Sequence, residues 1–80
     1  MNREIEKQIG QNIKAIRESI SMTQDVLSAK LQLLGCDITR SAMAKIEVGQ
    51  RHLYADELIL IKEILNTDFD TIFYGASKKE

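Results

Sequence analysis

The sequence contains no proline and no tryptophan, one cysteine and one histidine. Because proline is absent, no helix has to end or kink at a ring-locked φ angle. The single cysteine, Cys36, cannot form an internal disulfide and has no neighbours at metal-ligand spacing, which favours a reducing compartment. One histidine, with no glycine-rich phosphate loop and no paired carboxylates on an apolar floor, leaves no set of catalytic groups. The sequence therefore predicts a protein that is not an enzyme and that uses no metal or cofactor.

The chain also lacks a long apolar run. No segment approaches the roughly 20 apolar residues of a membrane-spanning helix. The first ten residues, MNREIEKQIG, are charged and have no signal-peptide core, so we expect a cytoplasmic protein. The 80 residues are predicted to form one domain, 1–80, which buries only about 60% of the surface of its unfolded chain.

No excess of positive charge is present either, because the formal net charge is −1. The net charge therefore gives no argument for nucleic-acid binding, and any such function depends on where the charges lie. Three cations nevertheless fall within the stretch ITRSAMAKIEVGQR, from Ile38 to Arg51. Such a stretch is typical either of a solvated helix face or of a surface that meets something negative.

Apolar spacing predicts the first two helices. The first carries isoleucines spaced four, four, three and four residues apart, which is the stripe of an amphipathic helix. These are Ile5, Ile9, Ile13, Ile16 and Ile20. The second is expected to begin at Gln24 after Thr23 as N-cap, to direct Leu27, Leu31 and Leu34 inward, and to stop at Gly35.

Three further helices are predicted in the second half. One runs from about 40 to 48 behind Thr39 as N-cap and buries Met43 and Ile46; the next covers 55–65. A last turn, 68–73, offers Phe69, Ile72 and Phe73 to the core. We therefore expect an all-α fold of five short helices without strands, with its core in 9–73 and a frayed tail at 75–80.

The order of these signals resembles the phage-repressor/Cro-type helix-turn-helix proteins, also called the XRE family. The resemblance covers about residues 9–73. It rests on Thr23-Gln24 opening the second helix, Thr39-Arg40-Ser41 opening the third, and Lys45-Ile46-Glu47 closing it. Gly49-Gln50-Arg51 and the last helix complete it. The resemblance implies a compact five-helix bundle of the lambda-repressor-like type.

The resemblance also implies a function, which is sequence-specific binding of double-stranded DNA by a transcriptional regulator. The helix at 39–48 would lie in the major groove, and the helix before it would lie across the backbone. The implied base-contacting residues are Arg40, Ser41, Ala42 and Lys45. The implied phosphate-contacting residues are Thr23, Gln24, Gln50 and Arg51. Arg17 and Glu47 match the family's buried ion pair, which would join the first helix to the third.

Three positions depart from the family pattern. Gln24 lies 23 positions before Glu47, about five more than is common, so the connection between the second and third helices is lengthened. Ser21 stands where the family usually has glycine, so a left-handed conformation there would cost up to about 1 kcal/mol. Val48 replaces a residue that is often polar, which removes one expected phosphate contact.

Leu60 and Ile64 suggest self-association. Leu58, Ile61 and Leu65 suffice for a core-facing stripe on the fourth helix, and Leu60 and Ile64 widen it on one side. We expect these two residues to form a homodimer interface that places two recognition helices on a palindromic operator. The alternative is that both only fill the core of a single chain.

A second function is compatible with the same residues. A helix-turn-helix fold can serve as a protein-interaction module of the antitoxin or anti-repressor type, with little DNA binding of its own. The net acidity and Val48 favour that alternative slightly, whereas Arg40, Lys45 and Arg51 favour DNA.

Overall fold

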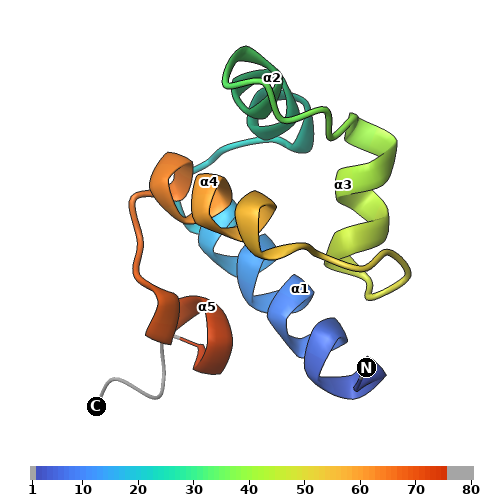
Figure 1. The fold of residues 1–80 in the computed structure, drawn as a ribbon. Helices are drawn as coiled ribbons and strands as arrows, with labels where there is room; N and C mark the ends of the chain where they lie inside the picture. Colours follow the sequence, from blue (N-terminus) through green and yellow to red (C-terminus); the bar gives the residue numbers. More distant parts are fainter. Residues whose placement is uncertain (1, 76–80) are drawn as a thin grey trace.

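The chain winds through five helices, shown in sequence colours in Figure 1. The computed structural model describes residues 2–75, and this part contains no strand. The helices are α1 (Arg3–Ser19), α2 (Gln24–Leu33), α3 (Arg40–Glu47), α4 (Ala55–Leu65) and α5 (Phe69–Tyr74). The expected all-α class and the bounds predicted for the fourth helix are confirmed.

Side-chain caps explain where four of the helices begin. The side chains of Asn2, Thr23, Thr39 and Asp68 each accept a hydrogen bond from a backbone N–H three residues later. Such a bond satisfies one of the amide groups that the first helical turn leaves without a partner. Both threonine caps predicted from the sequence are therefore confirmed.

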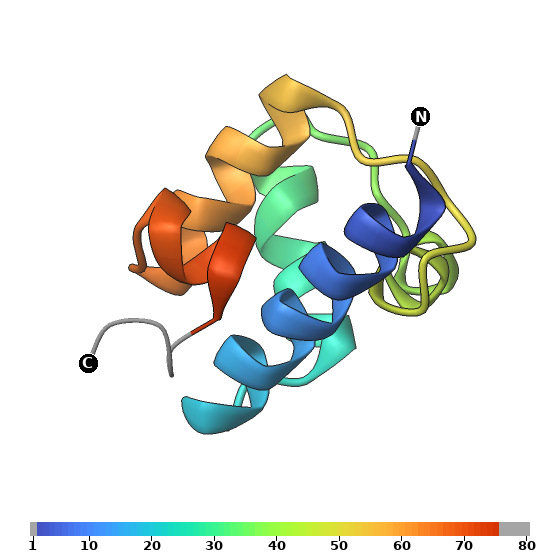
Figure 2. The same ribbon diagram turned by 90° about the horizontal axis from the view of Figure 1, so that it is seen from below.

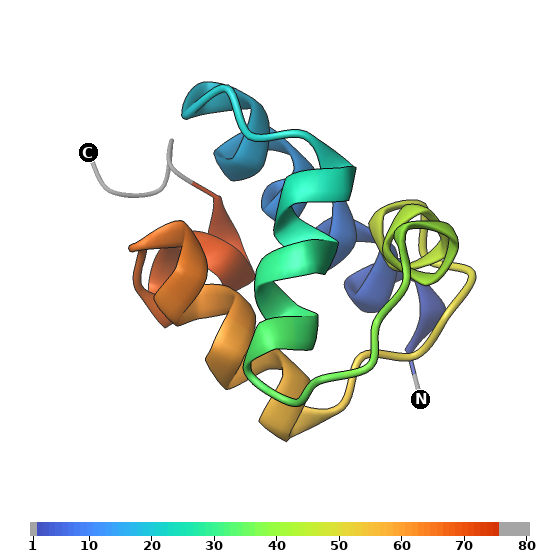
Figure 3. The same cartoon turned by 90° about the horizontal axis from the view of Figure 1, so that it is seen from above.

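Four pairs of neighbouring helices enclose the core. Helix α1 packs against α3 and α5, and α2 packs against α3 and α4. Seen from below, α1 crosses in front of α2, with α3 on one side and α4 and α5 on the other (Figure 2). Seen from above, α2 lies in front and α3 is viewed end-on (Figure 3). This arrangement holds α3 at the edge of the molecule with one long face open.

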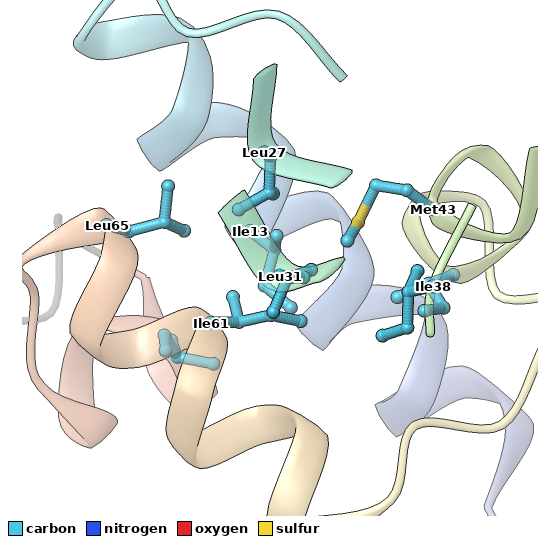
Figure 4. Packing of buried hydrophobic residues seen from close by; sticks show 9 residues of the cluster. Ile13, Leu27, Leu31, Ile38, Met43, Ile61 and Leu65 are labelled. Atoms are coloured by element: carbon cyan, nitrogen blue, oxygen red, sulfur yellow. The ribbon is translucent and has the colours of Figure 1, made fainter. Parts of the chain in front are cut away.

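The core is built from nine buried apolar side chains that converge between the helices (Figure 4). They are Ile13, Leu27, Leu31, Ile38, Met43, Ile46, Ile61, Leu65 and Ile72. The sequence stripes predict all of these except Ile38, which lies in the connection between α2 and α3. Its burial anchors the lengthened connection to the core.

Leu34 corrects a prediction, because its side chain is 55% exposed instead of facing inward. Helix α2 ends one residue earlier, and Gly35 then adopts a φ of +83°. The N–H of Cys36 donates to the carbonyl of Leu31 at 2.9 Å, which turns the chain away from the helix axis. The turn brings Ile38 into the core, where Leu34 was expected.

The ends of two predicted stripes are also less buried than expected. Ile5 and Ile20 are 57% and 48% exposed, because they flank the part of α1 that is covered by α3 and α5. Phe69, predicted to enter the core, is 37% exposed. Its ring stacks on that of Phe73, with 5.9 Å between the centroids. The Lys62 ammonium lies 5.4 Å from the centroid of the Phe69 ring. It covers the core from outside and does not fill it.

Ser21 lies in the left-handed region, with a φ of +58°. Because serine stands here in place of glycine, this conformation lowers the stability of the fold by up to about 1 kcal/mol.

The predicted frayed tail at 75–80 is wrong at its first residue. Gly75 is still ordered by the end of α5, because its N–H donates to the carbonyl of Thr71 at 2.9 Å. The remainder of the predicted tail, 76–80, lies outside the described residues.

Candidate nucleic-acid interface

Helix α3 has one buried side and one open side. Met43, Ile46 and Glu47 face the interior, whereas Ser41 and Lys45 are exposed. Val48, the residue that caps the helix, is 51% exposed beside them. The exposed residues lie at i, i+4 and i+7, so they form one stripe along the helix.

The two remaining candidate base-reading residues differ in exposure. The Arg40 side chain, at the first residue of α3, is 68% exposed. Ala42 was expected on the open side, but it is half-buried and packs against the core cluster. It lies one turn before the buried Ile46, about 40° from it in projection, which accounts for this correction.

The ion pair expected between Arg17 and Glu47 is present and buried. Two hydrogen bonds join them, from Arg17 Nε to Glu47 Oε2 at 2.8 Å and from Nη2 to Oε1 at 2.9 Å. The Arg17 Nη1 group also donates to the carbonyl of Met22 at 2.7 Å. The hydrogen bond to Glu47 raises the pKa of the Arg17 guanidinium, although burial opposes it. The pair therefore fixes the ends of α1 and α3 relative to the start of α2.

Gln24 is joined to the same pair. Its Nε2 donates to Glu47 Oε1 at 2.9 Å, which holds the amide at the first turn of α2. An amide nitrogen carries two hydrogens, so one remains for an acceptor outside the protein. Gln24 can therefore still donate to a phosphate, and its hydrogen bond to Glu47 fixes the position of its amide group.

An open, largely polar hollow lies where α1 ends and where α2 and α3 begin. It is lined by Lys14, Arg17, Glu18, Thr23, Gln24, Asp25 and Arg40. The hollow brings together three predicted DNA-contacting residues, from the starts of two helices, with Arg17 of the buried ion pair. Ser41, Lys45, Gln50 and Arg51 are not among its lining residues.

Three residues of this hollow, Lys14, Glu18 and Asp25, were not predicted as site residues from the sequence. Lys14 precedes Arg17 by three residues, so the helical period alone places it beside that residue once Arg17 is known to face α2. Asp25 lies in the first turn of α2, where an acidic residue is expected for the helix dipole alone, so the sequence indicates no other role for it. In the structure its Oδ1 lies 3.4 Å from Arg40 Nε, and the two side chains are 74% and 68% exposed.

Arg51 does not stand free for a phosphate. Its Nη1 and Nη2 donate to Glu57 Oε1 and Oε2, each at 3.0 Å, and Nη1 also donates to the carbonyl of His52 at 2.9 Å. These hydrogen bonds lower the pKa of Glu57, against the effect of its burial. Arg51 therefore joins the loop after α3 to the start of α4, while the neighbouring Gln50 is exposed.

Leu60 and Ile64, the predicted dimer residues, are half-buried and pack against the core of the same chain. The alternative of core filling thus accounts for part of their surface. More fully exposed apolar side chains lie at the end of α2, where Leu33 is 86% and Leu34 is 55% exposed. Together with Lys30 and Ile64 these two leucines line a shallow apolar depression, which we call the α2–α4 depression.

Comparison with known proteins finds no matching family model, no matching curated protein and no matching solved structure. In residues 2–75, no three histidine, cysteine or acidic side chains are grouped so that they could hold a metal ion. The same part of the chain has no helix whose length and apolarity would let it cross a membrane.

Proposed function

We propose that this chain is a sequence-specific double-stranded DNA-binding regulator of transcription, a repressor that acts as a homodimer on a palindromic operator. The observation that carries the proposal is the chain of hydrogen bonds Arg17–Glu47–Gln24. It holds the first turn of α2 against the last turn of α3 and so orients α3, with a backbone-facing amide at the start of α2 and a base-facing guanidinium at the start of α3 for one duplex.

In this proposal α3 enters the major groove. Arg40 donates to guanine O6 and N7, and Ser41 and Lys45 extend the reading surface along the exposed stripe. Thr23 and Gln24 contact a phosphate at the amino-terminal end of α2, and Gln50 contacts one after α3. Two of the predicted contacts are left out: Ala42 because it is half-buried, and Arg51 because Glu57 holds it.

The proposal fits the described α2–α3 connection, residues 34–39, although this is longer than the tight turn of the motif it resembles. Ile38 is fully buried, which ties the connection to the core and keeps α3 against α2. In this proposal the bundle is of the lambda-repressor-like type with an enlarged connection.

Selection of bound sites from a pool of random duplexes tests the proposal directly. We expect a single preferred site with two inverted halves about one helical turn apart. Affinity for it should fall steeply with salt, because phosphate contacts release counterions. A parent protein that binds no duplex at low salt would overturn the proposal.

Two substitutions distinguish a contact to a base from a contact to a phosphate. Arg40→Ala should weaken binding to the selected duplex by about 1 to 3 kcal/mol and weaken binding to a random duplex much less. Gln24→Ala should weaken both duplexes by similar factors, because a phosphate is the same under every sequence. Titrations of both variants on both duplexes at one salt concentration decide the matter, with melting temperatures to account for the hydrogen bond from Gln24 to Glu47. Equal losses for Arg40→Ala on the two duplexes would assign Arg40 to the backbone.

A protein-interaction module is the second candidate. Val48 favours it, since an apolar side chain that is 51% exposed interrupts the polar stripe of α3. Such a module would bind through apolar contact, so its affinity for a partner would change little with salt. Absence of duplex binding, together with a salt-insensitive complex, would establish this function instead.

A further inference from the structure

We propose that Asp25 determines specificity at the DNA interface, by positioning Arg40 and by keeping it from phosphates. This inference rests on the proposed function, because it concerns how the same surface distinguishes an operator from other DNA.

The ion pair spans the two helices of the interface. Asp25 is the second residue of α2 and Arg40 is the first residue of α3, so the pair closes one side of the hollow between them. The contact is made to Nε at 3.4 Å. Both terminal amino groups of the guanidinium therefore remain able to donate to a base edge.

Stability is not the main effect of this pair. Both side chains are more than two-thirds exposed, and ion pairs in that setting contribute little to folding because water screens them. The buried Arg17–Glu47 pair already fixes the helices. The effect of Asp25 is therefore expected in DNA binding, where the Arg40 guanidinium can contact either a phosphate or a base.

The choice differs between random DNA and an operator. On a random duplex the strongest available partner of Arg40 is a phosphate, and Asp25 both competes for the guanidinium and repels that phosphate. On an operator the terminal amino groups meet guanine while Nε stays beside Asp25, so the pair is kept. Asp25 consequently weakens binding to random DNA more than binding to the operator.

The test compares Asp25→Asn with a matched control, Asp70→Asn. Asp70 is likewise the second residue of a helix, α5, and is exposed, so the control removes the same charge from an equivalent helix position outside the hollow. Each substitution is made in the full chain, both alone and together with Arg40→Ala. Affinities for the selected and a random duplex are then measured over a range of salt concentrations.

We expect Asp25→Asn to lower the ratio of selected to random affinity roughly threefold to tenfold, mainly through tighter random binding. The salt slope on random DNA should steepen by up to about one phosphate equivalent, as Arg40 becomes free to bind there. In the Arg40→Ala background, and for Asp70→Asn, the ratio should stay within about twofold of its own reference.

Three outcomes would contradict the expectation. An unchanged ratio for Asp25→Asn overturns the inference and leaves the proposed function intact. An equal fall in the Arg40→Ala background also overturns it, because Asp25 would then act without Arg40. A parent chain that binds no duplex, or binds all duplexes alike, overturns the proposed function and this inference with it.

Discussion

Two glutamates each hold an arginine through both carboxylate oxygens, in different surroundings. The Arg17 and Glu47 side chains are 8% and 1% exposed, whereas those of Arg51 and Glu57 are 29% and 14% exposed. The first pair cannot be broken without leaving a buried charge, which would cost about 3 to 5 kcal/mol. The second pair is more exposed, so acid can reach its carboxylate.

The Arg51–Glu57 pair should make stability depend on pH. Because Arg51 lowers the pKa of Glu57 below its ordinary value of 4.5, the pair's contribution is complete above that value and is lost as the pH falls through the lower, folded value. Glu57→Gln should therefore unfold more easily than the parent by roughly 0.5 to 1.5 kcal/mol at pH 7. This difference should shrink as the pH approaches 3.

Urea unfolding of both proteins between pH 7 and 3 measures the effect. Glutamine can still accept the hydrogen bond that Glu57 receives from the N–H of Tyr54, so the start of α4 is preserved. Glu63→Gln, an exposed change on the same helix, serves as the control. A gap between parent and Glu57→Gln that is independent of pH would show that ionic pairing is not its cause.

At the scale of elements, much of this fold could be predicted from the sequence because its signals are local. Threonine caps and isoleucine spacing depend on residues within one or two turns. Both caps and the first helix are confirmed, although Ile5 and Ile20 at the ends of its stripe are exposed. The exchange of Leu34 for Ile38 in the core could not be foreseen. It depends on where the chain turns after α2, which is decided by contacts with distant helices.

The contacts of the candidate site likewise divide into those that could be predicted from the sequence and those that could not. Arg17 and Glu47 are matched to each other by the family resemblance, although 30 residues separate them. The engagement of Arg51 by Glu57 follows only from the path of the loop after α3. The approach of Asp25 to Arg40 likewise depends on how α2 meets α3, which no local pattern encodes.

The crossing of α1 over the end of α3 depends on Gly10. A Cβ atom there would collide with the carbonyl oxygen of Ile46 and would lie only 3.0 Å from that of Glu47. Alanine ordinarily stabilises a helix interior by about 0.5 to 1 kcal/mol relative to glycine. Here the collision is with backbone, which cannot rotate away, so the sign reverses.

We therefore expect Gly10→Ala to destabilise the protein by about 2 kcal/mol or more. For a domain of this size, that is a fall in melting temperature of about 8 to 16 °C. Gln11→Ala, at an exposed neighbour on α1, should change it little. Thermal unfolding followed by circular dichroism compares the two; equal melting temperatures would mean that α1 and α3 are not in close contact at this point.

For the molecule as a whole, self-association is the main proposal that remains. A 2-fold dimer would present two copies of α3 to one duplex, and the exposed leucines of the α2–α4 depression are the apolar surface that it would cover. We expect the parent to sediment as a dimer at concentrations on the order of tens of micromolar.

Leu33→Glu with Leu34→Glu should then give a folded monomer. Both side chains are more than half exposed, so their replacement removes little packing within one chain. Leu60 and Ile64 are less suitable targets, because charges at half-buried positions would also disturb the core. Ile5→Glu, an exposed apolar site near the start of α1, is the matched control and should remain dimeric. A monomeric parent would refute the proposal for the free protein.

The contact between α1 and α5 also affects the order in which the helices pack during folding. Asn12 of the first helix donates to the carbonyl of Ile72, 60 residues later, at 2.8 Å, and Ile13 and Ile72 share the core. Closing so long a loop is entropically the most expensive step in assembling the helices, so it comes late in folding. During synthesis α1 leaves the ribosome first and yet is the helix whose packing is completed last. Part of the apolar face of α1 is therefore expected to stay open to water until α5 has been made.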